Sequence, residues 1–218
     1  MPISPLRLLV LTFLLGLLLL LIQVNLLAIA FDKLGLSPLS GMLLLIGALA
    51  GSTLNLPVAR IRAWHMRAPS PLLPPLLRGS RPALEATILV AVNVGGCIIP
   101  VCFSVYLMWH ARLPLGEVLV AIAAVTTISY SFSRPVPRLG IAMPPLVAPL
   151  SAAIIALLID VNNGAPLAYI SGTLGVLIGA DLLRLNDVRR LGAPLASIGG
   201  AGTFDGIFIT GIVAALLV

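Results

Sequence analysis

Charged side chains are scarce in this sequence. Asp, Glu, Lys and Arg together make up 9% of the 218 residues and aromatic residues 5%, whereas 60% are hydrophobic and the mean hydropathy is +1.16. A chain of this composition has too little polar surface to cover a soluble globule of its size. The composition therefore predicts an integral membrane protein whose main partner is the lipid bilayer.

Cysteines and sequence motifs for metal or phosphate binding are also scarce. The only cysteines, Cys97 and Cys102, lie in one apolar segment, and their spacing would place them about 140° apart on a helix. That spacing argues against a disulfide between them and lacks the CxxC pattern of a metal site. The sequence has no phosphate-binding P-loop, no HExxH zinc helix and no GxSxG elbow, so we expect no metal and no cofactor.

Basic residues outnumber acidic ones, which gives a formal net charge of +6. An excess of this sign could indicate nucleic-acid binding, but the basic residues lie in loops between apolar segments instead of on a face that also carries aromatic side chains. We therefore interpret the charge as a determinant of membrane topology and expect no nucleic-acid partner.

Seven apolar segments predict the fold class, an all-α membrane protein with a bundle of about seven transmembrane helices in a single domain, residues 1–218. They cover residues 8–29, 39–56, 86–109, 118–132, 141–159, 167–183 and 198–218. The first could instead be a cleaved signal peptide, since Ala28-Ile-Ala30 offers a small-x-small cleavage site. We favour an uncleaved anchor, because this stretch is longer than the apolar core of a typical signal peptide.

The distribution of basic residues predicts the orientation of these spans. With the N-terminus in the cytoplasm, eleven basic residues are cytoplasmic and two lie outside, which is a strong positive-inside bias. The cytoplasmic group comprises Arg7, Arg60, Arg62, Arg67, Arg78, Arg81, Arg134, Arg138, Arg184, Arg189 and Arg190, and the outer group comprises Lys33 and Arg112. We therefore expect a multi-pass protein of a bacterial or archaeal inner membrane, with the C-terminus outside.

Residues 60–81 form a basic loop with several prolines between the second and third segments. Its composition indicates a stiff, extended cytoplasmic loop. Such a loop could bind anionic lipids, or it could serve only as a topology signal, which is the interpretation we favour.

The third segment is interrupted at Asn93, Gly95, Gly96 and Pro100. Proline removes a helical hydrogen bond and glycine weakens a helix, so this segment should be broken. Breaks at membrane depth build substrate sites in transporters, provided that protein or water satisfies the freed backbone groups. A packed proline kink is the simpler alternative.

Two aspartates stand close to the loop between the last two segments. Asp181 lies near the end of the sixth segment and Asp205 near the start of the seventh. An ionised Asp at the bilayer centre costs roughly 2.5–3.5 kcal/mol on insertion scales, so such a residue suggests a functional site. Two carboxylates in one site share a proton, and the pair can then activate water and polarise a peptide carbonyl.

Glycines surround both acids. Gly172, Gly175 and Gly179 fall within about 60° of one another on an ideal helix and should pack against one neighbour. The second acid follows Gly199, Gly200 and Gly202 and precedes Gly206, residues that would let backbones approach closely beside it or bind substrate. These glycines, Asn93 and the two acids are our candidate site.

The pattern around these acids resembles the Gly-x-Gly-Asp intramembrane aspartyl proteases, the presenilin and prepilin-peptidase group. In presenilin-like members one Asp ends the sixth span, and the other follows a Gly-x-Gly at the cytoplasmic start of the seventh. Here the second motif reads Gly200-Ala-Gly202-Thr-Phe-Asp205, two residues longer than Gly-x-Gly-Asp. The resemblance implies a peptidase with Asp181 and Asp205 as catalytic acids and a transmembrane peptide as substrate.

Three longer strings resemble an uncharacterised prokaryotic membrane family known only as a domain of unknown function. They read Gly-Ala-Asp-Leu-Leu, Arg-Pro-Val-Pro and Gly-Gly-Ala-Gly-Thr-Phe-Asp-Gly-Ile-Phe. This second resemblance spans most of the chain and implies no activity.

Two further interpretations of the same residues stay open. Asp181, Asp205 and Asn93 could coordinate a small cation or relay protons in a transporter, and free N–H groups at residues 199–202 could bind an anion. Alternatively, the acids are structural: Asp205 caps a helix, and Asp181 pairs with Arg184 or Arg189.

Overall fold

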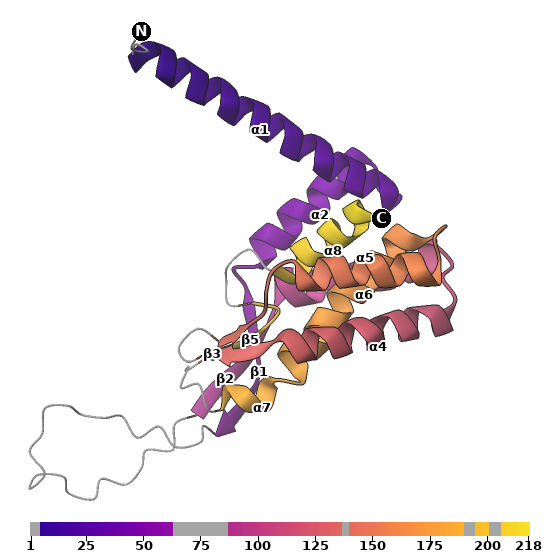
Figure 1. Cartoon of the computed structure of the whole chain (residues 1–218). Helices are drawn as coiled ribbons and strands as arrows, with labels where there is room; N and C mark the ends of the chain where they lie inside the picture. Colours follow the sequence, from indigo (N-terminus) through magenta and orange to yellow (C-terminus); the bar gives the residue numbers. More distant parts are fainter. Residues whose placement is uncertain (1–4, 63–86, 137–139, 190–194, 201–205) are drawn as a thin grey trace, which may run out of the picture.

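The computed structural model describes residues 5–62, 87–136, 140–189, 195–200 and 206–218, and most of them are helical (Figure 1). The α-helices are α1 (Pro5–Lys33), α2 (Pro38–Gly51), α3 (Ile99–His110), α4 (Leu115–Phe132), α5 (Val147–Ile159), α6 (Gly164–Val176), α7 (Leu185–Val188) and α8 (Gly206–Leu217). Two π-helical segments, η2 (Val94–Ile98) and η3 (Leu177–Leu182), continue directly into α3 and out of α6.

Helix α6 forms the centre of the helical bundle. It packs against α3, α4, α5 and α8, and most of its residues are buried. Tyr169 of α6 is fully buried and meets the ring of Phe103 on α3 edge to face, with centroids 4.9 Å apart. The hydrophobic core therefore lies around α6.

Helix α1 projects from this bundle (Figure 1). Ala30 and Phe31 near its C-terminal end are buried, whereas Leu15, Leu18 and Leu21 are each more than half exposed. Exposed large apolar side chains on a helix of this length are unfavourable in water and suit contact with lipid.

The glycines of α6 allow the close packing that the sequence predicts. A Cβ atom added at Gly175 would lie 2.7 Å from the Val125 side chain of α4, and one at Gly179 would lie 2.5 Å from the carbonyl oxygen of Thr126. Gly172 instead faces Ala152 of α5 and α8. The predicted glycine seam is confirmed for its two last members, which bring α4 and α6 together.

Five strands of the described residues form two small sheets at one end of the bundle. They are β1 (Asn55–Arg62), β2 (Thr87–Asn93), β3 (Arg134–Val136), β4 (Gly140–Ala142) and β5 (Leu195–Ile198). The larger sheet has the order β1-β2-β5, with β2 antiparallel to β1 and parallel to β5, and β3 pairs with β4. We call this end of the molecule the sheet end.

These strands correct the expected all-α fold class. The second, third, fifth and seventh apolar segments each contain part of a strand as well as a helix; residues 87–93, for example, are β2 instead of the first turns of a helix. Hydropathy alone does not separate a short buried strand from a helix, because both are runs of apolar residues. Of the predicted loop 60–81, residues 60–62 belong to β1 and the rest lie outside the described residues.

Within the described part of the chain, three helices are long and apolar enough to cross a membrane. They cover residues 15–33, 115–132 and 164–182, the last including η3. Four shorter apolar helices accompany them: Pro38–Gly51, Val94–His110, Val147–Ile159 and Ile207–Leu217. The length and composition of these helices indicate a membrane protein.

The end of the bundle opposite the sheets, which we call the far end, collects the other helix termini. The Lys33 ammonium at the end of α1 donates to the Leu216 carbonyl oxygen of α8 at 3.1 Å. A Cβ atom added at Gly164, where α6 begins, would meet the Val218 side chain. Successive long helices therefore run in alternating directions between the two ends.

Candidate functional site

Two π-helical segments lie beside the end of β5. Segment η2 follows β2 directly, and η3 ends the α6 helix. In η2 the pair Gly95-Gly96 removes side chains where the chain meets α2: a Cβ atom at Gly95 would collide with the Ala48 carbonyl oxygen. π-helical turns inside helices are uncommon and occur often at functional sites. We therefore take this region as the candidate functional site.

Asn93 fixes the start of η2. Its side chain is 1% exposed, and its Oδ1 accepts a hydrogen bond from the Gly96 N–H at 2.8 Å. Its Nδ2 donates to the Ser52 carbonyl oxygen at 2.7 Å and to Asn55 Oδ1 at 3.1 Å. The amide is thus engaged by three protein groups, and it holds η2 onto the α2–β1 connection.

A second polar contact joins the three strands of the larger sheet. The Ser197 hydroxyl of β5 donates to Asn55 Oδ1 at 2.6 Å. Asn55, at the start of β1, therefore contacts both Asn93 of β2 and Ser197 of β5. These contacts hold the end of β2, which leads into η2, beside the end of β5, which leads towards α8.

Gly199 directly follows β5 and lies against η2. Its φ of +84° is in the left-handed region, which favours glycine. A Cβ atom at this position would come within 2.7 Å of Cys97 Cβ and of the Gly96 carbonyl carbon. Both the backbone conformation and the close approach therefore require glycine here.

The predicted acid Asp181 binds the backbone of this same glycine. Its Oδ2 accepts a hydrogen bond from the Gly199 N–H at 2.7 Å. Asp181 lies in η3, the π-helical segment that ends α6. Its carboxylate therefore joins η3 to the residue that follows β5.

The structure thus brings together Asp181, Gly199 and, through Gly96, Asn93 from the predicted set. Gly200, with φ +94°, continues the junction after Gly199, and Gly206 is the first residue of α8. Gly202 and Asp205 lie outside the described residues.

Both described segments that flank Asp205 nevertheless contact η3. On one side, Gly199 donates to Asp181. On the other, Ile207 of α8 is 4% exposed and shares a buried cluster with Leu177 and Ala180 of η3.

Of the two arginines suggested as alternative partners of Asp181, Arg184 does not pair with it. Arg184 instead forms a salt bridge of 3.0 Å with Asp187. Its guanidinium also donates to the Tyr130 and Ser133 carbonyl oxygens at 2.8 and 3.0 Å and lies 4.0 Å from the Tyr130 ring centroid. Arg184 therefore anchors the C-terminal end of α4, and Asp181 stays bonded to Gly199.

Cys97, Asn55 and Ser197 are contacts that sequence reasoning missed. For Cys97 a signal was present, because it directly follows the pair Gly95-Gly96, and glycine lets another backbone approach closely. Among the residues that the structure describes, no group of three His, Cys, Asp or Glu side chains could hold a metal ion.

Comparison with known proteins gives one family and no activity. The family described as Protein of unknown function (DUF1614) matches residues 49–217, a range that contains every element of the site. No curated protein and no solved structure matches the chain.

Proposed function

The chain belongs to the DUF1614 family of proteins of unknown function, and from the contacts around Asp181 we propose that it is an intramembrane aspartyl-type peptidase. The catalytic acids of this proposal are Asp181 and Asp205. The substrate is a transmembrane peptide that enters at the sheet end.

One observation carries the proposal: the Asp181 carboxylate binds the first residue of the junction that leads to Asp205. The chain returns to η3 at Ile207, which shares a buried cluster with Ala180. This connectivity supports a site in which the two carboxylates meet.

Such a pair would hydrolyse a peptide bond without a cofactor. The ionised carboxylate takes a proton from water as the water oxygen bonds to the peptide carbonyl carbon, and the protonated carboxyl donates its proton to the carbonyl oxygen. The tetrahedral diol then collapses: the C–N bond breaks, the leaving nitrogen takes a proton and the carboxylic acid product forms. The two carboxyl groups exchange the roles of base and acid during each catalytic cycle, so both are required.

We place the sheet end in the cytoplasm and the protein in the inner membrane as a multi-pass protein. The described basic residues support this orientation: Arg60, Arg62, Arg134, Arg184 and Arg189 belong to the sheet end, whereas Lys33 and Arg112 belong to the far end. Cytoplasmic segments of membrane proteins are enriched in Lys and Arg. The four shorter apolar helices would complete a bundle of seven spans together with the strands that extend them.

Single replacements of the two acids test the peptidase directly. We expect the purified protein in detergent to cleave transmembrane model peptides, and Asp181→Asn and Asp205→Asn each to lower the rate by at least about 1,000-fold, with no further loss in the double variant because the acids act as a unit. Asp187→Asn is the matched control, since Asp187 lies near the same end but pairs with Arg184. Full activity of Asp205→Asn would overturn the acid pair.

A binding measurement avoids dependence on the chosen peptide. A peptide isostere that carries a hydroxyl in place of the scissile carbonyl mimics the tetrahedral diol and should bind more tightly than the parent peptide. We expect it to bind the unaltered protein and the Asp187→Asn control but neither acid variant. Equal binding to all four proteins would contradict the proposal.

A small cation- or proton-coupled transporter is the second candidate. Strand β2 leads through η2 into α3, so this apolar segment is not one continuous helix. Broken segments of this kind build transport sites. Asn93, however, already binds three protein groups and has little capacity left for an ion. Cation or proton flux in proteoliposomes that Asp181→Asn abolishes, without peptide cleavage by the unaltered protein, would favour this function over the peptidase.

A further inference from the structure

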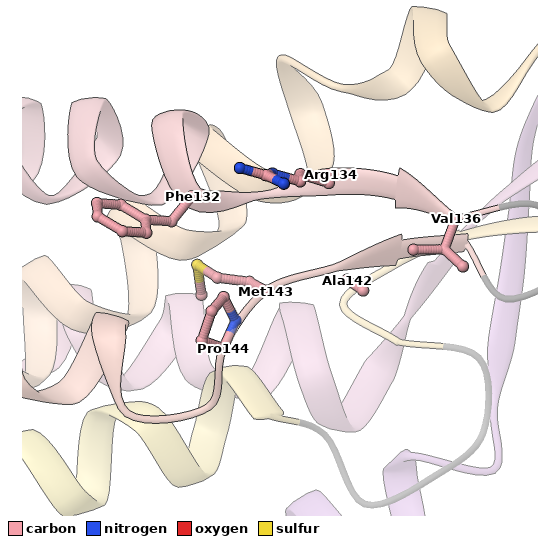
Figure 2. A pocket seen from close by; sticks show the side chains of 6 residues that line it. All are labelled: Phe132, Arg134, Val136, Ala142, Met143 and Pro144. Atoms are coloured by element: carbon pink, nitrogen blue, oxygen red, sulfur yellow. The ribbon is translucent and has the colours of Figure 1, made fainter.

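A pocket of about 500 Å³, separate from the region around Asp181, lies at the β3–β4 hairpin (Figure 2). Its lining is apolar except for one arginine. The lining residues are Phe132, Arg134, Val136, Ala142, Met143 and Pro144. Figure 2 shows two walls, one made by the α4–β3 connection with Phe132 and Arg134 and the other by the β4–α5 connection with Met143 and Pro144.

The pocket lies between the end of one helix and the start of the next. Helix α4, one of the three candidate spans, ends at Phe132, and α5 begins a few residues after Pro144. Phe132 is 52% exposed and Leu146, next to α5, 64% exposed. Exposed apolar side chains around a charged group at the end of a span are typical of the headgroup level of a bilayer.

Arg134 is the chemically distinctive member of the lining. It is exposed, and no hydrogen bond or ion pair joins its side chain to any residue that the structure describes. The nearby Arg184 differs, because four hydrogen bonds to Tyr130, Ser133 and Asp187 occupy its guanidinium. Arg134 therefore retains its donors for a ligand.

We propose that this pocket binds one anionic phospholipid of the membrane. The planar guanidinium of Arg134 offers paired N–H donors that match a phosphate, and Phe132 and Met143 offer apolar contact for the first methylene groups of an acyl chain. The volume of about 500 Å³ lies within the range of small-molecule sites. This inference does not depend on the peptidase, because it uses none of the residues assigned to it.

Lipid retention in detergent tests the proposal. In micelles no anionic bilayer surface is present, so a diffuse attraction between basic residues and a membrane is absent. We expect native mass spectrometry to show one bound phosphatidylglycerol on the unaltered full chain and at least about tenfold weaker binding of phosphatidylcholine. Inorganic phosphate should not displace the bound lipid, because it lacks the acyl chain.

Three variants distinguish a built site from general basic charge. Arg134→Gln removes the guanidinium, and Ala142→Phe fills the pocket while leaving Arg134 in place; each should weaken phosphatidylglycerol binding about tenfold, as expected for a charge-assisted hydrogen bond or for loss of the cavity. Arg60→Gln removes an exposed arginine of β1 at the same end and should leave binding unchanged. Thermal unfolding of each variant checks that it folds.

Two results would overturn the proposal. Unchanged retention in Arg134→Gln and Ala142→Phe would show that the pocket holds no lipid. Equal losses in Arg134→Gln and Arg60→Gln would show that the lipid responds to overall basic charge at the sheet end instead of to this pocket.

Discussion

At the scale of single residues, Gly199 carries two constraints at once. Its positive φ costs another residue about 1–2 kcal/mol, and its Cβ would overlap the η2 backbone, which adds about 1–3 kcal/mol of overpacking. We therefore expect Gly199→Ala to lower the free energy of unfolding by about 2–5 kcal/mol, measured by denaturant unfolding in detergent.

Gly140 provides the matched control for this prediction. Its φ is +105°, but a Cβ atom added there would meet no atom within 4 Å. Gly140→Ala should therefore show the backbone cost alone, about 1–2 kcal/mol. If both variants lowered the free energy of unfolding by the same amount, the close contact between Gly199 and η2 would contribute nothing to the cost of Gly199→Ala.

Asp160 makes the connection between α5 and α6 sensitive to acid. Hydrogen bonds from the Asn163 side chain, and from the N–H groups of Asn163 and Asn162, lower the pKa of this carboxyl. Since the folded-state pKa lies below the unfolded value of about 3.9, this contribution to stability is complete above that pH and disappears as the pH falls through the folded-state pKa.

The corresponding measurement is a series of melting temperatures between pH 2 and pH 7. Asp160→Ala should melt at a lower temperature than the unaltered protein at neutral pH, and the difference should disappear at the acid end of the series. A difference that stays constant with pH would show that the ionised carboxylate of Asp160 does not stabilise the fold.

Site residues could be identified from the sequence where a polar side chain stands inside an apolar segment. Asp181 and Asn93 stand out because a polar side chain inside an apolar run must find a partner, and both do so, in Gly199 and in Gly96. Asn55 and Ser197 gave no such signal, because polar residues at the ends of apolar runs are ordinary. Their contact depends on strand register, which no local pattern specifies.

At the scale of elements, the seam between α4 and α6 leads to a third prediction. The atom nearest to a Cβ at Gly179 would be the Thr126 carbonyl oxygen, 2.5 Å away, and a backbone atom cannot rotate aside as a side chain can. We expect Gly179→Ala to cost about 1–3 kcal/mol through overpacking, measured by the same unfolding assay.

Gly116 in the first turn of α4 is the control for this change. A Cβ atom there would meet nothing within 4 Å, and alanine favours a helix by up to about 1 kcal/mol relative to glycine. Gly116→Ala should therefore be neutral or stabilising. A stabilising Gly179→Ala would contradict the close packing of α4 and α6.

Hydropathy predicted where the chain is apolar but not how each apolar run is divided into helices and strands. Segment 118–132 became α4 nearly unchanged, whereas segment 86–109 divides at Asn93 into β2 and the η2–α3 helix. Two features mark that division in retrospect: residues 87–92 are rich in β-branched residues, and Gly95-Gly96 weakens the start of the helix. The pairing of β2 with β1 and β5 is non-local and could not be inferred from either segment alone.

At the scale of the whole molecule, the described strands and most of the described basic residues lie at one end. The larger sheet ties together chain segments as far apart as β1 and β5, and the two proposed sites lie at this same end, one at Asp181 and one at Arg134. Lipid at the Arg134 pocket would contact the end of α4, the helix that Arg184 anchors to the segment following η3. The two sites are thus connected through α4, although they share no residue.

The orientation of the molecule is the fourth prediction. Two exposed valines report on the two ends: Val58 of β1, 60% exposed, at the sheet end, and Val161, 70% exposed, between α5 and α6 at the far end. In a chain whose Cys97 and Cys102 are replaced by alanine, Val58→Cys and Val161→Cys each introduce one reactive thiol. The excess of arginine at the sheet end predicts that this end is cytoplasmic. A membrane-impermeant maleimide added to intact spheroplasts should then label Val161→Cys at once and Val58→Cys only after the membrane is permeabilised. The reverse order of labelling would place the arginines outside and would require a peptide substrate to reach Asp181 from that side.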